Sequence, residues 1–277
     1  MKARLLPLAA AAAACALSLS SCGGGSTTPS GSDTAGTLRI GIKFDQPGLG
    51  LKQGSEYTGF DVDVARYIAK ELGKEGKIEF KEAPTPQREV LIETGQVDYI
   101  VGTYSITDAR KQKVSFAGPY FVAGQDLLVR STDTNITGPE SLTGKKLCSV
   151  KGSTPAKKVK DLYPQTQLQE YDTYSKCVEE LAADTIDAVT TDNTILAGYA
   201  SQPQYAGKLR LVGKTFSTEN YGVGLKKGDT AMCQKITDAL NKMITSGEWQ
   251  QIVTKNFGPA GFKVDTKANP PKPAACA

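Results

Sequence analysis

The stretch that decides the fold is Gly59-Phe60-Asp61-Val62-Asp63-Val64-Ala65-Arg66-Tyr67-Ile68-Ala69-Lys70-Glu71-Leu72. From position 61 its apolar residues follow helical spacing, and Gly73 suits a C-terminal stop, so the pattern predicts an amphipathic helix over 61–72. Residues 38–42 before it alternate as a strand does, and residues 78–80 after it form a second strand pattern. A strand, a helix and a strand in this order predict a parallel pair of strands.

The alternation of strand and helix patterns continues along the chain. Further strands are expected at 97–101, 125–130, 146–150, 168–171, 187–191, 209–212 and 221–225, and further helices at 87–93, from 155, at 175–183, at 193–200 and around 236–244 and 249–253. Because the two halves are similar in pattern, we expect an α/β fold of two lobes facing each other across a ligand cleft, each lobe a mostly parallel central sheet flanked by helices. The expected bounds are 37–122 with 218–264 for lobe 1, 123–217 for lobe 2 and 265–277 for a C-terminal tail. Hinge crossings are expected near 122–124 and 215–220.

Charge and composition exclude several classes of function. The chain has 33 Lys and Arg against 29 Asp and Glu, a formal net charge of +4. Its first residues and its tail carry this surplus, so the body between them has no net charge, which argues against a nucleic-acid partner. The chain has no histidine. Ser-His-Asp catalysis and histidine-ligated zinc are therefore excluded, and neither a metal nor a cofactor is expected.

The first residues indicate export. Lys2 and Arg4 precede an apolar run over 5–19 that is too short to span a bilayer comfortably but suits a secretory signal. The run ends in Leu19-Ser20-Ser21-Cys22, which resembles a bacterial lipobox, in which the cysteine is lipidated. We expect a leader over 1–21 and a lipid anchor at Cys22, followed by a flexible linker within 22–36. The expected location is the outer face of the cytoplasmic membrane of a Gram-positive-type cell. A plain signal peptide with an incidental cysteine is the alternative.

Export makes the remaining cysteines interpretable. Cys148, Cys177, Cys233 and Cys276 allow three pairings in an oxidising compartment. We predict the disulfides Cys148–Cys177 and Cys233–Cys276, because each pair falls within one expected lobe. The two remaining pairings would cross-link the lobes and obstruct their closure.

The stretch from Gly59 to Leu72 resembles the signature of the family 3 extracellular solute-binding proteins, the amino-acid-capturing subunits of ABC importers. The resemblance extends from about Thr37 to Phe262, and it implies a two-lobe periplasmic-binding-protein-like fold. Asp61 and Asp63 could suggest a calcium loop, but the other ligands of such a loop are absent. We interpret both as structural charges that are favourable in the first turn of a helix.

The resemblance also assigns a shell around the ligand's α-carboxylate and ammonium. It places Arg110, at the end of Gly102-Thr103-Tyr104-Ser105-Ile106-Thr107-Asp108-Ala109-Arg110, on the α-carboxylate, and a guanidinium suits that group because it forms two parallel hydrogen bonds. It places Gly102, Thr103 and Ser105 in the surrounding shell. It also assigns Ser153 and Thr154, at an expected helix start in the other lobe, to the binding of the same α-carboxylate. It pairs Asp192 with the ligand ammonium.

The positions that the resemblance places around the ligand's side chain indicate an acidic ligand. Lys43, Arg88 and Tyr174 match positions in the glutamate- and aspartate-binding branch of the family. Two extra cations facing a cleft need a partner charge, since an unpaired desolvated charge is costly, and an acidic side chain supplies it. The alternative is that Lys43 and Arg88 are ordinary surface residues.

The sequence therefore predicts a lipid-anchored, non-catalytic receptor, expected to be a monomer, that captures glutamate or aspartate and delivers it to permease subunits in the membrane. A receptor for another polar amino acid such as glutamine is an alternative with the same fold and partners. Two further hypotheses are a dehydratase or lyase on the same fold and a sensor-type ligand-binding module.

Overall fold

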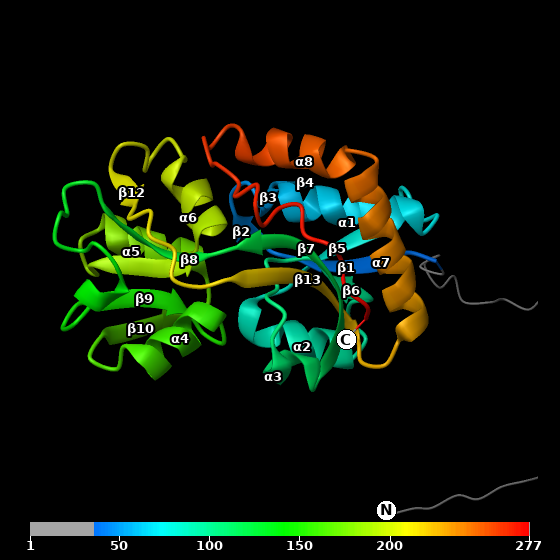
Figure 1. The fold of residues 1–277 in the computed structure, drawn as a ribbon, viewed down its shortest axis with the longest axis horizontal. Helices are drawn as coiled ribbons and strands as arrows, with labels where there is room; N and C mark the ends of the chain where they lie inside the picture. The colour runs from blue at the N-terminus through cyan, green and yellow to red at the C-terminus, as the bar shows by residue number, and fades with distance from the viewer. Residues whose placement is uncertain (1–35, 277) are drawn as a thin grey trace, which may run out of the picture. The chain divides into compact units, whose positions relative to one another are not determined.

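The computed structural model describes residues 36–276. The expected leader, Cys22 and the linker up to residue 35 lie outside the described residues. The described part forms two lobes, each built on a five-stranded sheet, and it confirms the two-lobe α/β fold expected from the sequence (Figure 1). None of the helices found between residues 36 and 276 is both long enough and apolar enough to cross a membrane.

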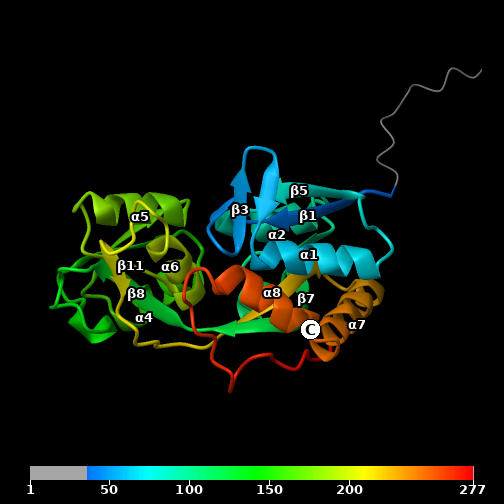
Figure 2. The same cartoon turned by 90° about the horizontal axis from the view of Figure 1, so that it is seen from above.

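The first lobe has a mixed sheet in the order β5-β1-β6-β13-β7. Its strands are β1 (Leu38–Ile42), β5 (Ile78–Glu82), β6 (Tyr99–Ile100), β7 (Val114–Ala123) and β13 (Glu219–Lys226). β1 pairs in parallel with β5 and β6, as expected, whereas β13 pairs antiparallel with β6 and β7. Its helices are α1 (Phe60–Glu71), η1 (Thr85–Gln87), α2 (Arg88–Glu93), α3 (Asp108–Lys111), α7 (Thr230–Thr245) and α8 (Glu248–Phe257). Helices α1, α7 and α8 pack together on one side of this lobe (Figure 2).

Helix α1 begins where the sequence pattern places it, and its start is fixed by a close backbone approach. Gly59 has φ 120°, and a Cβ at this position would lie 2.2 Å from the carbonyl oxygen of Leu49. Only glycine fits there. Val62, Ile68 and Ala69 on the inner face of the helix are fully buried in the main core.

The second lobe repeats the arrangement with the order β10-β9-β11-β8-β12. Its strands are β8 (Gln125–Arg130), β9 (Lys146–Val150), β10 (Gln167–Tyr171), β11 (Ala188–Asp192) and β12 (Leu209–Leu211), and its helices are η2 (Pro139–Ser141), α4 (Thr154–Leu162), α5 (Tyr174–Ala182) and α6 (Asn193–Ala200). β9 is parallel to β10 and β11, while β8 is antiparallel to β11 and β12. Strand β7 was not expected from the sequence, and neither was a small third sheet of β2 (Asp45–Gln46), β3 (Gly50–Gln53) and β4 (Glu56–Thr58).

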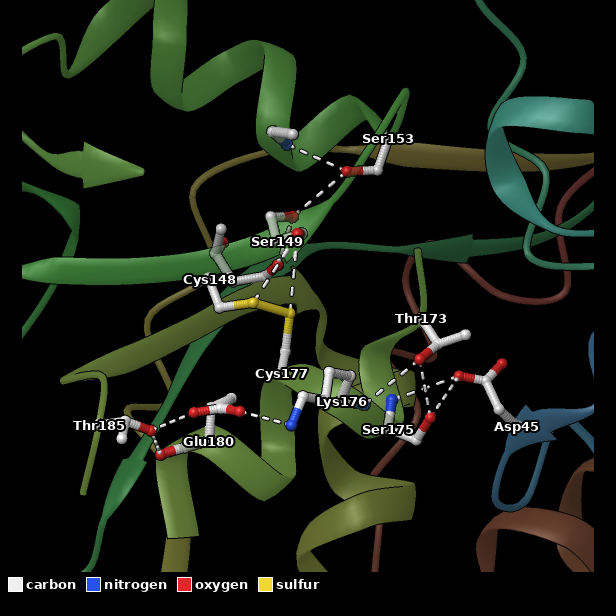
Figure 3. Close-up of a disulfide and its surroundings, with 12 residues drawn as sticks. Asp45, Cys148, Ser149, Ser153, Thr173, Ser175, Lys176, Cys177, Glu180 and Thr185 are labelled. Atoms are coloured by element: carbon white, nitrogen blue, oxygen red, sulfur yellow. Dashed lines mark hydrogen bonds and ion pairs between the residues drawn. A yellow bond between two sulfur atoms is a disulfide. The ribbon is translucent and has the colours of Figure 1, made fainter. Parts of the chain in front are cut away.

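The structure contains the disulfides Cys148–Cys177 and Cys233–Cys276, the two pairs predicted from the sequence. The first joins β9 to α5, and Figure 3 shows it beside Ser149 and Ser153. The second joins α7 to the C-terminal tail. Neither disulfide connects the two sheets.

The C-terminal tail lies along the crossing between the lobes. Strand β7 ends at Ala123, and the single residue Gly124 separates it from β8. The side chain of Asn269 accepts a hydrogen bond from the N–H of Val122 at 2.9 Å and donates one to the carbonyl of Val122 at 2.9 Å. The N–H of Ala274 donates to the carbonyl of Gly118 at 2.8 Å. The tail thus supplies partners to backbone groups of the crossing strand that the sheet leaves unpaired.

We predict that Asn269→Ala lowers the free energy of unfolding by about 1–3 kcal/mol, because it leaves both polar backbone groups of Val122 without their partner. Denaturant unfolding followed by circular dichroism measures the change. Lys272→Ala, at an exposed position of the same tail, is the matched control and should change the free energy by less than about 0.5 kcal/mol. Equal effects of the two substitutions would contradict the bracing role of Asn269.

Candidate ligand-binding site

A small polar cavity gathers most of the residues predicted to bind a ligand. It has about 250 Å³ of empty volume, and its lining comes from both lobes. The lining residues are Thr85, Arg88, Thr103, Ser105, Arg110, Ser153, Thr154, Pro155, Tyr174, Thr191, Asp192 and Ile195. Two predicted residues, Gly102 and Lys43, lie outside this lining but next to it. The carbonyl of Gly102 accepts from Arg88, and Lys43 donates to Thr85.

A larger hollow lies elsewhere on the first lobe, over α1 and α8. It has about 1650 Å³ of empty volume, and its lining includes Tyr57, Arg66 and Lys255. None of the predicted site residues is among its lining residues. The small cavity is therefore the candidate site, because buried polar groups converge on it.

The fold brings the site residues together at the carboxyl ends of parallel strands. Lys43 follows β1, Gly102 and Thr103 follow β6, and Ser153 follows β9. Asp192 is the last residue of β11. Loops after neighbouring parallel strands meet at one edge of a sheet, which is where open α/β sheets bind their ligands.

The guanidinium of Arg110 is held in place by the first lobe and also touches the second. Its Nη1 donates to the carbonyl of Ser105 at 2.8 Å, and its Nε lies 3.5 Å from a carboxylate oxygen of Glu89. Its Nη2 donates to the carbonyl of Gly152 in the second lobe at 3.2 Å. The group also lies 5.1 Å from the ring centre of Tyr104. Each terminal nitrogen keeps a second N–H, so a bidentate contact with a carboxylate remains open.

Arg88 and Lys43 are buried cations whose hydrogen bonds within the described chain go to neutral oxygens. Arg88 is 2% exposed, and its Nη1 donates to the carbonyl of Gly102 at 3.0 Å. Its guanidinium stacks 4.0 Å from the ring centre of Tyr104, and its buried Nε has no hydrogen-bond partner within residues 36–276. Lys43 is 5% exposed and donates to the hydroxyl of Thr85 at 2.7 Å. Both cations are thus oriented by neutral oxygens and not by a carboxylate.

Burial shifts the pKa of both cations toward the neutral form. It lowers the pKa of Arg88 to about 10, with the charge of Arg110 as the second cause. Burial, followed by the charge of Arg88, also holds the pKa of Lys43 well below its ordinary value. The interpretation of Lys43 and Arg88 as exposed surface residues is therefore wrong.

Asp192 carries the negative charge on the other side of the cavity. It is 3% exposed, and one carboxylate oxygen accepts a hydrogen bond from the hydroxyl of Tyr221 at 2.7 Å. Its other oxygen, Oδ1, has no hydrogen-bond partner in the described part of the chain, and neither has the hydroxyl of Thr191. Burial and the nearby charge of Glu219 raise the pKa of Asp192 to about 7.

The second lobe contributes the start of α4 and the start of α5. Ser153 caps α4 by accepting from the N–H of Ala156 at 3.1 Å, and Ser153, Thr154 and Pro155 at the start of this helix line the cavity. The hydroxyl of Thr154 donates to Glu219 at 2.9 Å. Tyr174 is the first residue of α5, and burial together with the charge of Asp192 raises its pKa to about 12.

Some residues of the site were not predicted from the sequence. Thr85, Pro155, Thr191 and Ile195 line the cavity and were not predicted to do so. Each lies within three residues of a predicted site residue, so proximity in the sequence was the available signal. Glu219 was missed altogether. It begins β13 and accepts from Thr154 and from Gln125 at 2.8 Å, contacts that only the folded chain reveals.

Comparison with known proteins gives a consistent assignment. The family model described as bacterial extracellular solute-binding proteins, family 3, matches residues 38–259. The glutamate-binding protein GluB of Corynebacterium efficiens is 44% identical over 93% of this chain and 92% of its own length. The ABC transporter glutamine-binding protein GlnH of Bacillus subtilis is 39% identical over 78% of this chain and 79% of its own. A solved ancestral arginine-binding protein bound to arginine is 35% identical and superposes with a TM-score of 0.76 over 81% of this chain and 100% of its own. The chain belongs to the bacterial extracellular solute-binding proteins, family 3.

Proposed function

We propose that this chain is the receptor of an ABC importer for an acidic amino acid, glutamate or aspartate. The observation that carries the proposal is the charge of the cavity. Its lining holds two cations, Arg88 and Arg110, and one carboxylate, Asp192, with a third cation, Lys43, directly behind Thr85. An amino acid with a neutral side chain brings no net charge, whereas an acidic one brings the negative charge that this surplus calls for.

Each group of such a ligand has a partner of suitable chemistry. Arg110 would hold the α-carboxylate together with Ser105 and the start of α4, because a guanidinium can bind a carboxylate through two parallel hydrogen bonds. Asp192 would accept from the ligand ammonium through its unpartnered Oδ1. Arg88 would reach the side-chain carboxylate with its unpartnered Nε. Lys43, which donates to the cavity residue Thr85, would add a positive charge close to that carboxylate.

The comparisons support an amino-acid ligand, and they leave open whether its side chain is an acid or an amide. One relative is named for glutamate and another for glutamine. We favour glutamate or aspartate because the hydrogen bonds that Lys43 and Arg88 donate within residues 36–276 all go to neutral oxygens. A neutral amide would leave these buried cations incompletely paired. We propose that the protein binds and releases its ligand unchanged, since each group assigned in the cavity serves to hold the ligand.

Location and partner are also part of the proposal. The sequence around Cys22 supports export and attachment by lipid to the outer face of the cytoplasmic membrane. A receptor held there would deliver its ligand to the permease subunits of the importer.

The charge assignment is tested by titrating the purified protein from residue 23 with a panel of amino acids. Wild type should prefer glutamate or aspartate to the corresponding amides. Arg110→Ala should abolish measurable binding of every amino acid, because removing one member of a buried pair costs roughly 3–5 kcal/mol, or two to four decades of affinity. The double variant Lys43→Met with Arg88→Leu should lower the affinity for glutamate by decades. It should also reduce the ratio of the glutamate affinity to the glutamine affinity.

The matched control for this double variant is Arg66→Leu with Lys81→Met, which removes the same charge from side chains of the first lobe that are 46% and 43% exposed. It should leave both affinities within about threefold, because exposed charges contribute little. Comparable affinities of wild type for glutamate and glutamine would refute the acidic side chain. They would not contradict the proposal that the protein is an amino-acid receptor.

We also predict that amino-acid affinity falls as the solution becomes more acidic than pH 7. Burial raises the pKa of Asp192 in the free protein to about 7, and the groups facing it are Glu219, Tyr221, Arg110 and Arg88. The ammonium pairs with the ionised carboxylate, so below this pH a proton must leave before the ligand binds. The association constant should then fall by up to about tenfold per pH unit. Calorimetry between pH 5.5 and 7.5, in buffers of different ionisation enthalpy, should show proton release on binding. A flat affinity over this range would contradict the pairing.

The lipid anchor is tested separately. Cys22→Ala should release the protein from membranes of the producing cells without changing its affinity for the amino acid, because the anchor precedes the part of the chain that forms the site. Fractionation after a high-salt wash measures the release, and Cys22→Ala protein that stays with the membrane pellet would argue against lipidation.

A further inference from the structure

Asp61 makes contacts outside its own helix that its place in a first helical turn does not predict. It lies in the first turn of α1, as expected, but its side chain is fully buried and points away from its own helix. One oxygen accepts from the backbone N–H of Thr103 at 2.9 Å, and the other accepts from the hydroxyl of Tyr120 at 2.8 Å. Asp63, two residues later, bonds instead to Lys255 and Asn256 of α8. The two carboxylates of this turn therefore have different roles.

The partner of Asp61 is a residue in an unusual backbone conformation. Thr103 has φ 44°, and among residues 36–276 only Asp184 is another non-glycine residue with positive φ. A β-branched residue is disfavoured in this left-handed region, so surrounding contacts must hold it there. The bond from its N–H to Asp61 is one such contact, and the bond from its hydroxyl to Gln46 at 3.2 Å is another.

The backbone that Asp61 holds is the backbone that orients both guanidinium groups. The carbonyls of Gly102 and Thr103 accept from Arg88 at 3.0 and 3.4 Å. The carbonyl of Ser105 accepts from Arg110 at 2.8 Å. A rotation of the peptide between Gly102 and Thr103 would turn the carbonyl of Gly102 away from Arg88 and would displace the segment that carries the carbonyl of Ser105. The chain of contacts thus runs from α1 through Thr103 to the two groups that face the ligand.

Asp61 also lies near the positive charges of the site. Burial raises its pKa to about 6, while Tyr120, Thr103, Lys43 and Arg88 each favour its ionised form. An ionised carboxylate only accepts hydrogen bonds, which matches its two donors, and such charge-assisted bonds are about twice as strong as neutral ones.

We propose that Asp61 is a positioning residue for the ligand site. Through the N–H of Thr103 it fixes residues 102–105, and these in turn orient Arg88 and Arg110 toward the ligand. This inference rests on the proposed amino-acid-binding function. It predicts that a substitution of Asp61, which does not line the cavity, weakens the binding of every ligand that contacts Arg110.

The test compares ligand affinities of folded variants. Asp61→Asn keeps the shape but loses the charge, and it should raise the Kd of glutamate and of glutamine by about fivefold or more, since a neutral acceptor holds Thr103 less firmly. Asp61→Ala, which removes the acceptor, should have a larger effect. Affinities are measured by calorimetry at a temperature where circular dichroism shows each variant to be folded.

Two controls separate positioning from stability. Asp63→Asn removes a carboxylate from the same helical turn, and Ile68→Val loosens the packing of the same helix. Both should leave the Kd values within about threefold of wild type, whatever their melting temperatures. Tyr120→Phe removes the other partner of Asp61 and should do the same, because the bond to Thr103 remains.

The outcomes are distinguishable. Folded Asp61→Asn protein whose Kd values for both ligands stay within threefold of wild type would overturn the positioning role, and so would equal losses in Asp63→Asn. Wild-type protein that binds no amino acid would instead overturn the proposed function and this inference with it.

Discussion

Three basic side chains, those of Lys43, Arg88 and Arg110, are buried close together, and the rest of the site is arranged around this concentration of like charge. Removing them from water and placing them side by side is unfavourable, as the lowered pKa values of Lys43 and Arg88 show. Backbone carbonyls and the hydroxyl of Thr85 orient Arg88 and Lys43 without neutralising them. Of these three cations, only Arg110 has a carboxylate of the described residues in salt-bridge range, that of Glu89. A negatively charged ligand group therefore meets donors that are already oriented, and its binding offsets a cost that the folded protein otherwise carries.

The fold makes this concentration possible because it supplies oriented backbone at the ends of strands. The loop after β6 presents three carbonyls to the two arginines, and the loop after β9 presents the start of α4. Carbonyl oxygens thus surround the positive charge on the first-lobe side, and the capped start of α4 borders the cavity on the other. The disulfide Cys148–Cys177 ties β9 to α5, whose first residue is Tyr174, so it links two elements that contribute to the second-lobe side of the cavity.

Much of this arrangement follows from local patterns, and the rest depends on contacts between distant residues. Helical spacing over 61–72 and the strand pattern over 38–42 predict α1 and β1 because periodicity reports burial directly. Long β7 was missed since Gly118 and Pro119 interrupt its pattern. The part played by Asp61 could not be predicted, because its partner Thr103 lies 42 residues away and an acidic residue in a first helical turn already has a sufficient local explanation. The position of Lys43 behind Thr85 likewise depends on how two separate loops pack.

Several contacts join the two lobes, and one of them involves Arg110, which lines the cavity. Asp45 of the first lobe accepts hydrogen bonds from Ser175 and Tyr199 of the second, and the carbonyl of Pro47 lies so close to Gly198 that no side chain would fit there. Arg110 takes part as well, through its bond to the carbonyl of Gly152. A ligand favours a closed arrangement only if it contacts both lobes in that state. An amino acid held by Arg110 on one side and by Asp192 on the other meets this condition with its α-carboxylate and ammonium alone. Under the proposed function, closure would be common to all amino-acid ligands, while Arg88 and Lys43, both in the first lobe, would distinguish their side chains.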